Sequence, residues 1–316
     1  MSPTDSTNND YAEIRRRLAA GENIWLDAGN GTELQARGAK MHPKVWCGVA
    51  HVENPQIMHS IHADNIKAGA NVITSNTFSC NRNMMGPAGL GDRVAEAVTT
   101  GVELALKARE QTPHNHPVLV AGSMSHQVPI TPGTNKRNPE TLPSADVALN
   151  NFNEIAGLLA DAGADLIILE MMSDPDFANL AIDAASATGL PVWLGLCCKK
   201  SDNGELISYT RPEMSFDALC DELIDSRSEV VGVMHSNIDY VNDAINSIRR
   251  CTKAPVMAYP DSGHFTMPEW NFEETISPHD YAKRSSGWLD NGVQVIGACC
   301  GMGVEHIDAC VKAANA

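Results

Sequence analysis

Two adjacent cysteines near the end of the chain, Cys299 and Cys300, point most directly to chemistry. Gly297, Gly301 and Gly303 lie around them, and a glycine-rich segment of this kind makes a poor core but a good turn for presenting ligands. Thiolates bind zinc well, whereas neighbouring cysteines seldom bond to each other without strain. The pair therefore predicts a metal site. The alternative is that both thiols pack as small hydrophobes.

Other polar side chains follow the apolar runs that we interpret as strands. Two thiolates and one imidazole from a nearby strand would fill three of the four tetrahedral positions of zinc and leave one for a substrate, as in catalytic sites. The polar residues at these strand ends are Asp27, Glu33, Asn76, Cys80, His126, Glu170, Cys198, His235, Asp261 and His264.

Eight short runs rich in Val, Ile and Leu predict the strands that must position these groups. Helical spacing between the runs is typical of a parallel sheet covered by helices, and we predict an α/β fold of the (β/α)8 TIM-barrel type. The predicted strands are 24–28, 71–76, 118–123, 166–170, 192–197, 230–234, 255–259 and 294–298.

The predicted helices include residues 57–68 and 93–110, where apolar residues recur every three or four positions. Gly69, Gly163 and Gly292 each follow such a segment and precede a strand, which indicates a repeated helix stop. A doubly wound open sheet is the competing architecture. It is disfavoured because no G-x-G-x-x-G turn follows the first strand.

Length and composition favour one barrel domain over residues 1–316, with residues 1–12 as a flexible N-terminal tail. No linker or change of composition suggests a second domain. The longest irregular segment, residues 127–144, contains four prolines and follows the third strand, where it could act as a lid.

The formal net charge of -16 disfavours nucleic acid and membrane surfaces as partners, because it repels phosphate groups. No apolar run approaches the roughly 20 residues of a membrane span, and the first residues do not resemble a signal peptide. Nine cysteines, an odd number, fit reduced thiols better than a disulfide framework. We therefore expect a cytoplasmic protein that acts on small molecules.

Five segments together resemble the zinc-dependent homocysteine S-methyltransferases, a family that includes betaine- and S-methylmethionine-dependent enzymes. The resemblance covers nearly the whole chain and is most specific in its last segment. The segments are residues 26–38 (LDAGNGTELQARG), 73–78 (ITSNTF), 169–172 (LEMM), 259–263 (YPDSG) and 295–307 (VIGACCGMGVEHI).

The resemblance implies that Cys299 and Cys300 bind zinc with a third ligand after the sixth strand. The family has a cysteine there, whereas this chain has His235. Imidazole is a competent zinc ligand, and this exchange makes the site one charge less negative. We expect a strongly activated donor to suit such a site, because a thiolate on a more electropositive zinc is a weaker nucleophile. A satisfied polar residue is the alternative role for His235.

The resemblance also implies residues that bind the acceptor. Asp27 and Glu170 occupy the acidic positions expected to meet its ammonium group, and backbone N–H groups around Gly29 are expected to meet its carboxylate. Asn76 and Thr77 are expected to line the pocket. Asp27 could instead cap a helix or close a turn.

For the methyl donor, the resemblance places Trp46 where its indole face would attract a methyl-bearing cation. Ser79 stands where betaine-using relatives carry tyrosine, which disfavours betaine. The extra groups His126, His264 and Cys198 could adjust the metal or replace His235 as a ligand.

The leading hypothesis is transfer of a methyl group from S-methylmethionine or S-adenosylmethionine to a zinc-bound thiol, homocysteine, giving methionine. One alternative is a diverged barrel enzyme that acts on another thiol or methylated substrate. Another is a metal- or amino-acid-binding protein without turnover.

Overall fold

The computed structural model describes residues 3–131, 134, 136–262, 264–266 and 271–315. Eight parallel strands form one sheet in the order β1-β12-β9-β8-β5-β4-β3-β2. A parallel bridge from Leu26 to Val72 links its two edges, so the sheet closes into the predicted (β/α)8 barrel and is not an open doubly wound sheet. The strands are β1 Ile24–Trp25, β2 Val72–Thr74, β3 Leu119–Ser125, β4 Leu166–Met172, β5 Val192–Leu196, β8 Val230–Asn237, β9 Val256–Asp261 and β12 Val295–Ile296.

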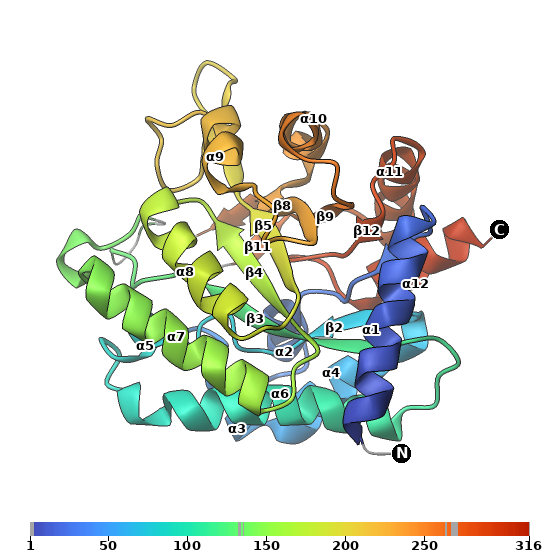
Figure 1. Cartoon of the computed structure of the whole chain (residues 1–316), viewed down its shortest axis with the longest axis horizontal. Helices are drawn as coiled ribbons and strands as arrows, with labels where there is room; N and C mark the ends of the chain where they lie inside the picture. Colours follow the sequence, from blue (N-terminus) through green and yellow to red (C-terminus); the bar gives the residue numbers. More distant parts are fainter. Residues whose placement is uncertain (1–2, 132–133, 135, 263, 267–270, 316) are drawn as a thin grey trace.

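The helices surround the strands (Figure 1). All eight strands of the barrel sheet lie within or overlap the predicted runs, and the two predicted helices correspond to α4 and α6. The helices are α1 Pro3–Ala19, α2 Asn30–Ala36, α3 Ala50–Glu53, α4 Pro55–Ala68, α5 Arg82–Met85, α6 Val94–Gln111, α7 Ala145–Asp161, α8 Pro175–Ala187, α9 Phe216–Leu223, α10 Val241–Cys251, α11 Pro278–Asp290 and α12 Val304–Ala314, with 3₁₀ turns at η1 Gly91–Arg93, η2 Pro139–Thr141 and η3 Ile238–Tyr240.

Successive residues along a barrel strand point to opposite faces of the sheet and so belong to two different apolar cores. Leu166 and Ile168 belong to the cluster inside the barrel, whereas Ile167 and Leu169 belong to the cluster that includes the helices. Both faces of each strand are therefore buried, which explains why the strands read as continuous apolar runs. The predicted helix stops are also confirmed, since Gly69, Gly163 and Gly292 have φ of 103°, 95° and 81°.

Helix α1 lies at the amino ends of the strands. Tyr11, Ile14 and Leu18 belong to the same apolar cluster as the barrel interior, and the Tyr11 hydroxyl donates to Glu229 Oε2 (3.0 Å) and accepts from Trp193 Nε1 (3.2 Å). The chain is thus helical from Pro3. The helix was not predicted from the sequence, and the flexible tail expected for residues 1–12 stays a prediction.

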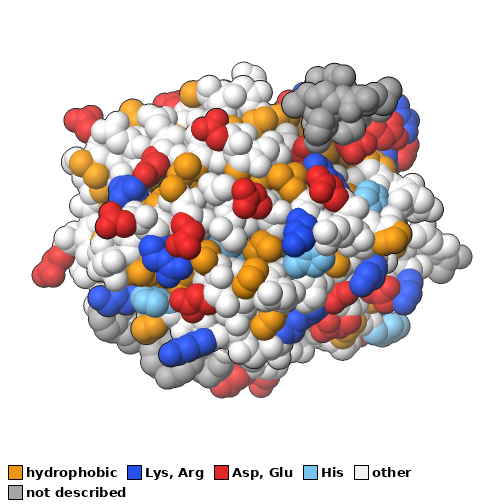
Figure 2. All heavy atoms as spheres, turned by 90° about the horizontal axis from the view of Figure 1, so that it is seen from below, with side chains coloured by type: hydrophobic (Ala, Val, Ile, Leu, Met, Phe, Trp, Pro, Cys, Tyr) orange, Lys and Arg blue, Asp and Glu red, His pale blue; other side chains and the backbone are white. Residues whose placement is uncertain are grey.

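Two antiparallel hairpins that the sequence analysis did not predict extend from the carboxyl ends of the strands. Strands β6 Cys198–Lys200 and β7 Leu206–Ser208 follow β5, and β10 His264–Thr266 and β11 Asn271–Glu273 follow β9. In the described part of the chain, no helix is both long and apolar enough to cross a membrane. Basic, acidic and apolar side chains are interspersed on the face shown in Figure 2.

Candidate active site

The cysteine pair lies directly after β12, on a turn held between neighbouring strands. The Cys299 N–H donates to the Pro260 carbonyl (3.0 Å), and the Ser262 N–H donates to the Cys300 carbonyl (2.9 Å). On the other side, a Cβ at Gly29 would lie 2.7 Å from the Cys299 carbonyl oxygen, so this close approach requires glycine. The ends of β1 and β9 therefore fix the turn.

Four side chains that can bind a metal converge at this turn. The ligand atoms of His235, Asp261, Cys299 and Cys300 all lie within 4.8 Å of one another. Cys299 Sγ is 3.2 Å from His235 Nδ1 and 3.8 Å from Cys300 Sγ. The structure thus brings together the three residues predicted as zinc ligands and adds Asp261. One nitrogen, two sulfurs and one oxygen form a donor set that suits a transition metal such as zinc.

Asp261 was named in the sequence analysis as a polar residue after the seventh strand, but not as a ligand. Its Oδ1 is buried and has no hydrogen-bond partner among the described residues. Burial raises the pKa of this carboxyl group, while the charge of His235 opposes that shift. A buried carboxylate oxygen without a partner is costly, and a cation would satisfy it. One feature of the sequence could have indicated Asp261 as a ligand. It ends the strand next to β12, which is followed by the cysteine pair.

The two thiols differ in how readily they ionise. Burial raises the pKa of Cys299, whereas the hydrogen bond from Cys299 and the neighbouring His235 lower the pKa of Cys300. Burial alone would lower the pKa of His235, but contacts with Cys300 and Glu170 outweigh it and raise the pKa to about 10. The cluster thus favours a thiolate at Cys300, the form that binds metals.

The backbone is strained where it presents three residues to this site. Trp46, Met171 and His235 have positive φ values of 46°, 61° and 49°, which side chains rarely adopt. At His235 the pairing of β8 with β9 shifts register, and Cys197 Sγ donates to the His235 carbonyl (2.9 Å). Strain of this kind persists where the surrounding structure enforces it, and it is common at functional sites.

Two cavities meet at the metal-ligand cluster. The outer cavity has a volume of about 510 Å³ and is lined by Trp46, Phe78, Tyr209 and other residues. The inner cavity, of about 40 Å³, is lined by Gly29, Asn76 and Glu170 among others. The residues that line both cavities are Trp46, Phe78, His235 and Cys300.

Among the residues predicted to bind the acceptor, Asp27 and Thr77 lie behind the cavities and line neither. Asp27 is fully buried and accepts hydrogen bonds from the Thr74 N–H (2.7 Å) and hydroxyl group. Burial raises the pKa of Asp27 well above its usual value. The Thr77 hydroxyl donates to the Ser123 carbonyl (2.7 Å). In this structure both residues connect neighbouring strands.

Gly29, Asn76, Glu170 and Trp46, in contrast, all line the inner cavity. The Asn76 amide donates to the Cys47 carbonyl (2.9 Å) and contacts His51. Trp46 Nε1 is buried and has no hydrogen-bond partner among the described residues. This indole N–H is a donor available to a ligand.

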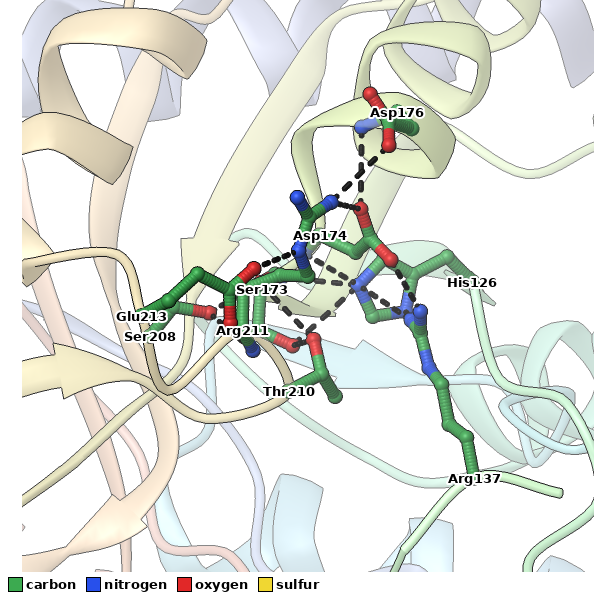
Figure 3. Close-up of polar contacts among 9 residues, drawn as sticks. All are labelled: His126, Arg137, Ser173, Asp174, Asp176, Ser208, Thr210, Arg211 and Glu213. Atoms are coloured by element: carbon green, nitrogen blue, oxygen red, sulfur yellow. Dashed lines mark hydrogen bonds and ion pairs between the residues drawn. The ribbon is translucent and has the colours of Figure 1, made fainter. Parts of the chain in front are cut away.

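His126 belongs to a separate polar cluster beside the site (Figure 3). Its Nε2 accepts hydrogen bonds from the N–H groups of Ser173 (2.9 Å) and Asp174 (3.2 Å). Burial and the nearby Arg137 lower its pKa far below the usual range, so it stays neutral and can accept. Cys198 is buried, and its N–H bonds to Ser236. Neither residue belongs to the metal-ligand cluster. The side chain of His264 lies outside the described part of the structure.

The same cluster anchors the irregular segment after β3 to the barrel. Arg137 from this segment and Arg211 from the loop after β7 both bind the carboxylate of Asp174 (Figure 3). Gln127, Val128 and Ile130, in the first part of the segment, line the outer cavity. The segment predicted as a lid is thus tied down at its far end. Whether it moves stays a prediction.

Fold and site together define a (β/α)8 barrel with a cluster of thiols, imidazole and carboxylate whose donor atoms suit a metal, at the place where two cavities meet. The family model for homocysteine S-methyltransferase matches residues 24–314. The chain therefore belongs to the homocysteine S-methyltransferase family, and it is a methyltransferase.

Individual relatives agree with this assignment. The chain is 28% identical to homocysteine S-methyltransferase 2 from Zea mays over 91% of this chain and 88% of the relative. It is 23% identical to selenocysteine methyltransferase from Astragalus bisulcatus over 89% of each. The metallated form of the homocysteine methyltransferase MmuM from Escherichia coli superposes with a TM-score of 0.74 at 23% identity, covering 93% of this chain and 96% of MmuM. This likeness shows the shared fold.

Proposed function

We propose that the protein transfers the methyl group of an onium donor, S-methylmethionine or S-adenosylmethionine, to the thiol of homocysteine, giving methionine. The observation that carries the proposal is the convergence of His235, Cys299 and Cys300 where the outer and inner cavities meet. A group in either cavity can reach this cluster. Family membership supports homocysteine as the acceptor.

The chemistry of the donor set fits zinc, with His235, Cys299 and Cys300 as the residues that would hold it. Bound there, zinc would act as a Lewis acid that favours the ionised form of a substrate thiol. Asp261 is a fourth candidate ligand, and its carboxylate would return the negative charge that His235 removes relative to a third cysteine.

The reaction itself needs little from the side chains beyond position and charge. The acceptor thiolate attacks the methyl carbon, a new S–CH₃ bond forms, and the bond to the donor's positive sulfur breaks, so the donor leaves as a neutral thioether. Water takes the thiol proton. Alignment of the two sulfurs supplies most of the acceleration.

Glu170, Gly29 and Asn76 are the residues proposed to meet the amino-acid part of the acceptor, with Asp27 and Thr77 supporting them from behind. A water needs about 10–15 Å³ of such a cavity, so the 40 Å³ inner cavity has room for a few small groups. The rest of the acceptor would extend toward the outer cavity.

The outer cavity is proposed to take the donor, because Trp46, Phe78 and Tyr209 present aromatic side chains to it. Aromatic faces attract cations, particularly where water is excluded. A methyl-bearing sulfonium is therefore a better occupant than an uncharged donor.

Replacing Gly31 with alanine is expected to raise the donor KM about 5- to 30-fold, with unchanged zinc content. A Cβ at Gly31 would lie 2.2 Å from the Trp46 ring, so the indole must move. The lost contact with a cation is worth about 1–2 kcal/mol. Gly157→Ala, in α7 with open space around it, is the matched control. Steady-state kinetics with varied donor measures the effect, and equal KM values in both variants would exclude Trp46 from the donor site.

A cytoplasmic location is part of the proposal. All nine cysteines are free, as expected where thiols stay reduced.

A second candidate is methyl transfer to a selenol or another thiol. It is favoured by the selenocysteine methyltransferase among the relatives. Competition between homocysteine and selenocysteine in one assay distinguishes the two.

The proposed function is tested by zinc content and methyl transfer measured on the same preparation. We expect near one zinc per chain, transfer of labelled methyl from an onium donor to homocysteine, loss of both after chelation, and recovery of both with added zinc. A zinc-free protein that transfers methyl at an unchanged rate would contradict the metal mechanism. A zinc-loaded protein that transfers nothing from either donor would favour binding without turnover.

A further inference from the structure

The two ring nitrogens of His235 face different partners. Nε2 lies 2.7 Å from Oε2 of Glu170, at the end of β4, and Nδ1 lies 3.2 Å from Cys299 Sγ. All three side chains are largely buried, so water competes little for these contacts.

The partner of Nε2 decides which nitrogen can bind a metal. An ionised carboxylate only accepts hydrogen bonds, so Nε2 carries the proton toward Glu170. When a metal displaces the second proton, the ring is neutral and its lone pair is on Nδ1, which faces the thiols. Metal-bound histidines commonly donate their second N–H to a carboxylate, which fixes the tautomer and raises the basicity of the ligand.

We propose that Glu170 is a positioning residue that holds His235 with Nδ1 toward the metal, forming a carboxylate–histidine–metal relay. The inference rests on the zinc site of the proposed function and assigns Glu170 a second role besides contact with the acceptor. A cysteine ligand at this position would need no such partner, so this role of Glu170 is tied to His235.

The surroundings leave the imidazole little freedom to turn. Ser123 donates its hydroxyl to the other oxygen of Glu170, which fixes the carboxylate. The Phe78 ring lies against the imidazole with centroids 5.0 Å apart, and the Tyr259 ring lies edge-on at 6.4 Å. The Cys197 thiol holds the His235 carbonyl. Each contact comes from a different strand or strand end, so the whole barrel mouth orients the ring.

A double-mutant cycle on zinc affinity tests this role. Zinc is the probe, and its affinity is measured by competition with a chelator on the whole protein. Glu170→Gln removes the charge but keeps the size, and we expect zinc to bind roughly 10- to 100-fold more weakly. In a His235→Cys background the same change is expected to have little effect, because no imidazole remains to be oriented. Glu33→Gln, another buried carboxylate at the barrel mouth, is the matched control.

The coordinating nitrogen is read directly by loading the protein with ¹¹³Cd and measuring its coupling to ¹⁵N-labelled histidine. Coupling to Nδ1 of His235 is the expected result, and coupling to Nε2 would overturn the inference. An equal loss of zinc affinity in both backgrounds, or no loss in either, would also overturn it. A wild-type protein that binds no zinc would instead contradict the proposed function itself.

Discussion

A protein with Cys299 replaced by serine is expected to lose its zinc and at least about a thousandfold in kcat/KM for methyl transfer. Serine keeps the size of the side chain, but its hydroxyl does not ionise near neutral pH and is a poor zinc ligand. Cys299 contacts both His235 and Cys300, so its replacement removes the ligand that lies next to the other two proposed zinc ligands. Several kcal/mol of charge stabilisation disappear, and each 1.36 kcal/mol is a factor of ten in rate.

Cys310→Ser is the control for this experiment. Cys310 is also a buried free thiol, but it lies in α12 and bonds to Ser285 (3.3 Å). We expect this variant to keep its zinc and its rate. Elemental analysis and initial rates measure the two quantities, and a Cys299→Ser protein with full zinc and full activity would refute the assigned site.

Replacing Asp174 with alanine is expected to lower the free energy of unfolding by about 3–5 kcal/mol. Asp174 is buried, binds Arg137 and Arg211, and caps α8 by accepting from the Asp176 N–H. Its removal leaves the largely buried Arg137 without its ion-pair partner, and an uncompensated buried charge costs this much. Asp174→Asn keeps the cap and should fall between alanine and wild type.

Asp176→Ala is the matched control, because Asp176 also binds Arg211 (3.0 Å) but its side chain is 80% exposed. An exposed pair of this kind is worth about 1 kcal/mol at most. Denaturant unfolding of the three variants gives the comparison. Equal destabilisation by Asp174→Ala and Asp176→Ala would show that the cluster in Figure 3 contributes nothing through burial.

The barrel could be predicted because its signals are local. Each strand is a short apolar run, and Gly69, Gly163 and Gly292 mark the helix ends. Helix α1 was not predicted because its first residues are polar, although Tyr11, Ile14 and Leu18 have helical spacing. The strands of the two hairpins after β5 and β9 have only 3 residues each, which is too short to leave a recognisable periodic pattern in the sequence.

The site was harder to predict, because closeness across a barrel depends on how the strands are staggered. Strand direction predicts that polar groups gather at one end of the barrel. His235, Cys299 and Cys300 do converge there. The inclusion of Asp261 and the hydrogen bond from His235 to Glu170 depend on register shifts in β4 and β8. The exclusion of Asp27 from the cavities likewise depends on a bond to the next strand.

The contacts of helix α1 also constrain the order in which the chain can fold during synthesis. It is synthesised before the barrel strands, yet Tyr11 bonds to residues 182 and 218 positions later in the chain. The helix can contact β1 and β3 early, but the partners of Tyr11 at β5 and just before β8 are synthesised later, and the Gln294 side chain that binds the Leu18 carbonyl comes later still. Contacts of such long sequence separation form late. The contacts that hold α1 over the amino end of the barrel are therefore complete only after the later strands have been synthesised.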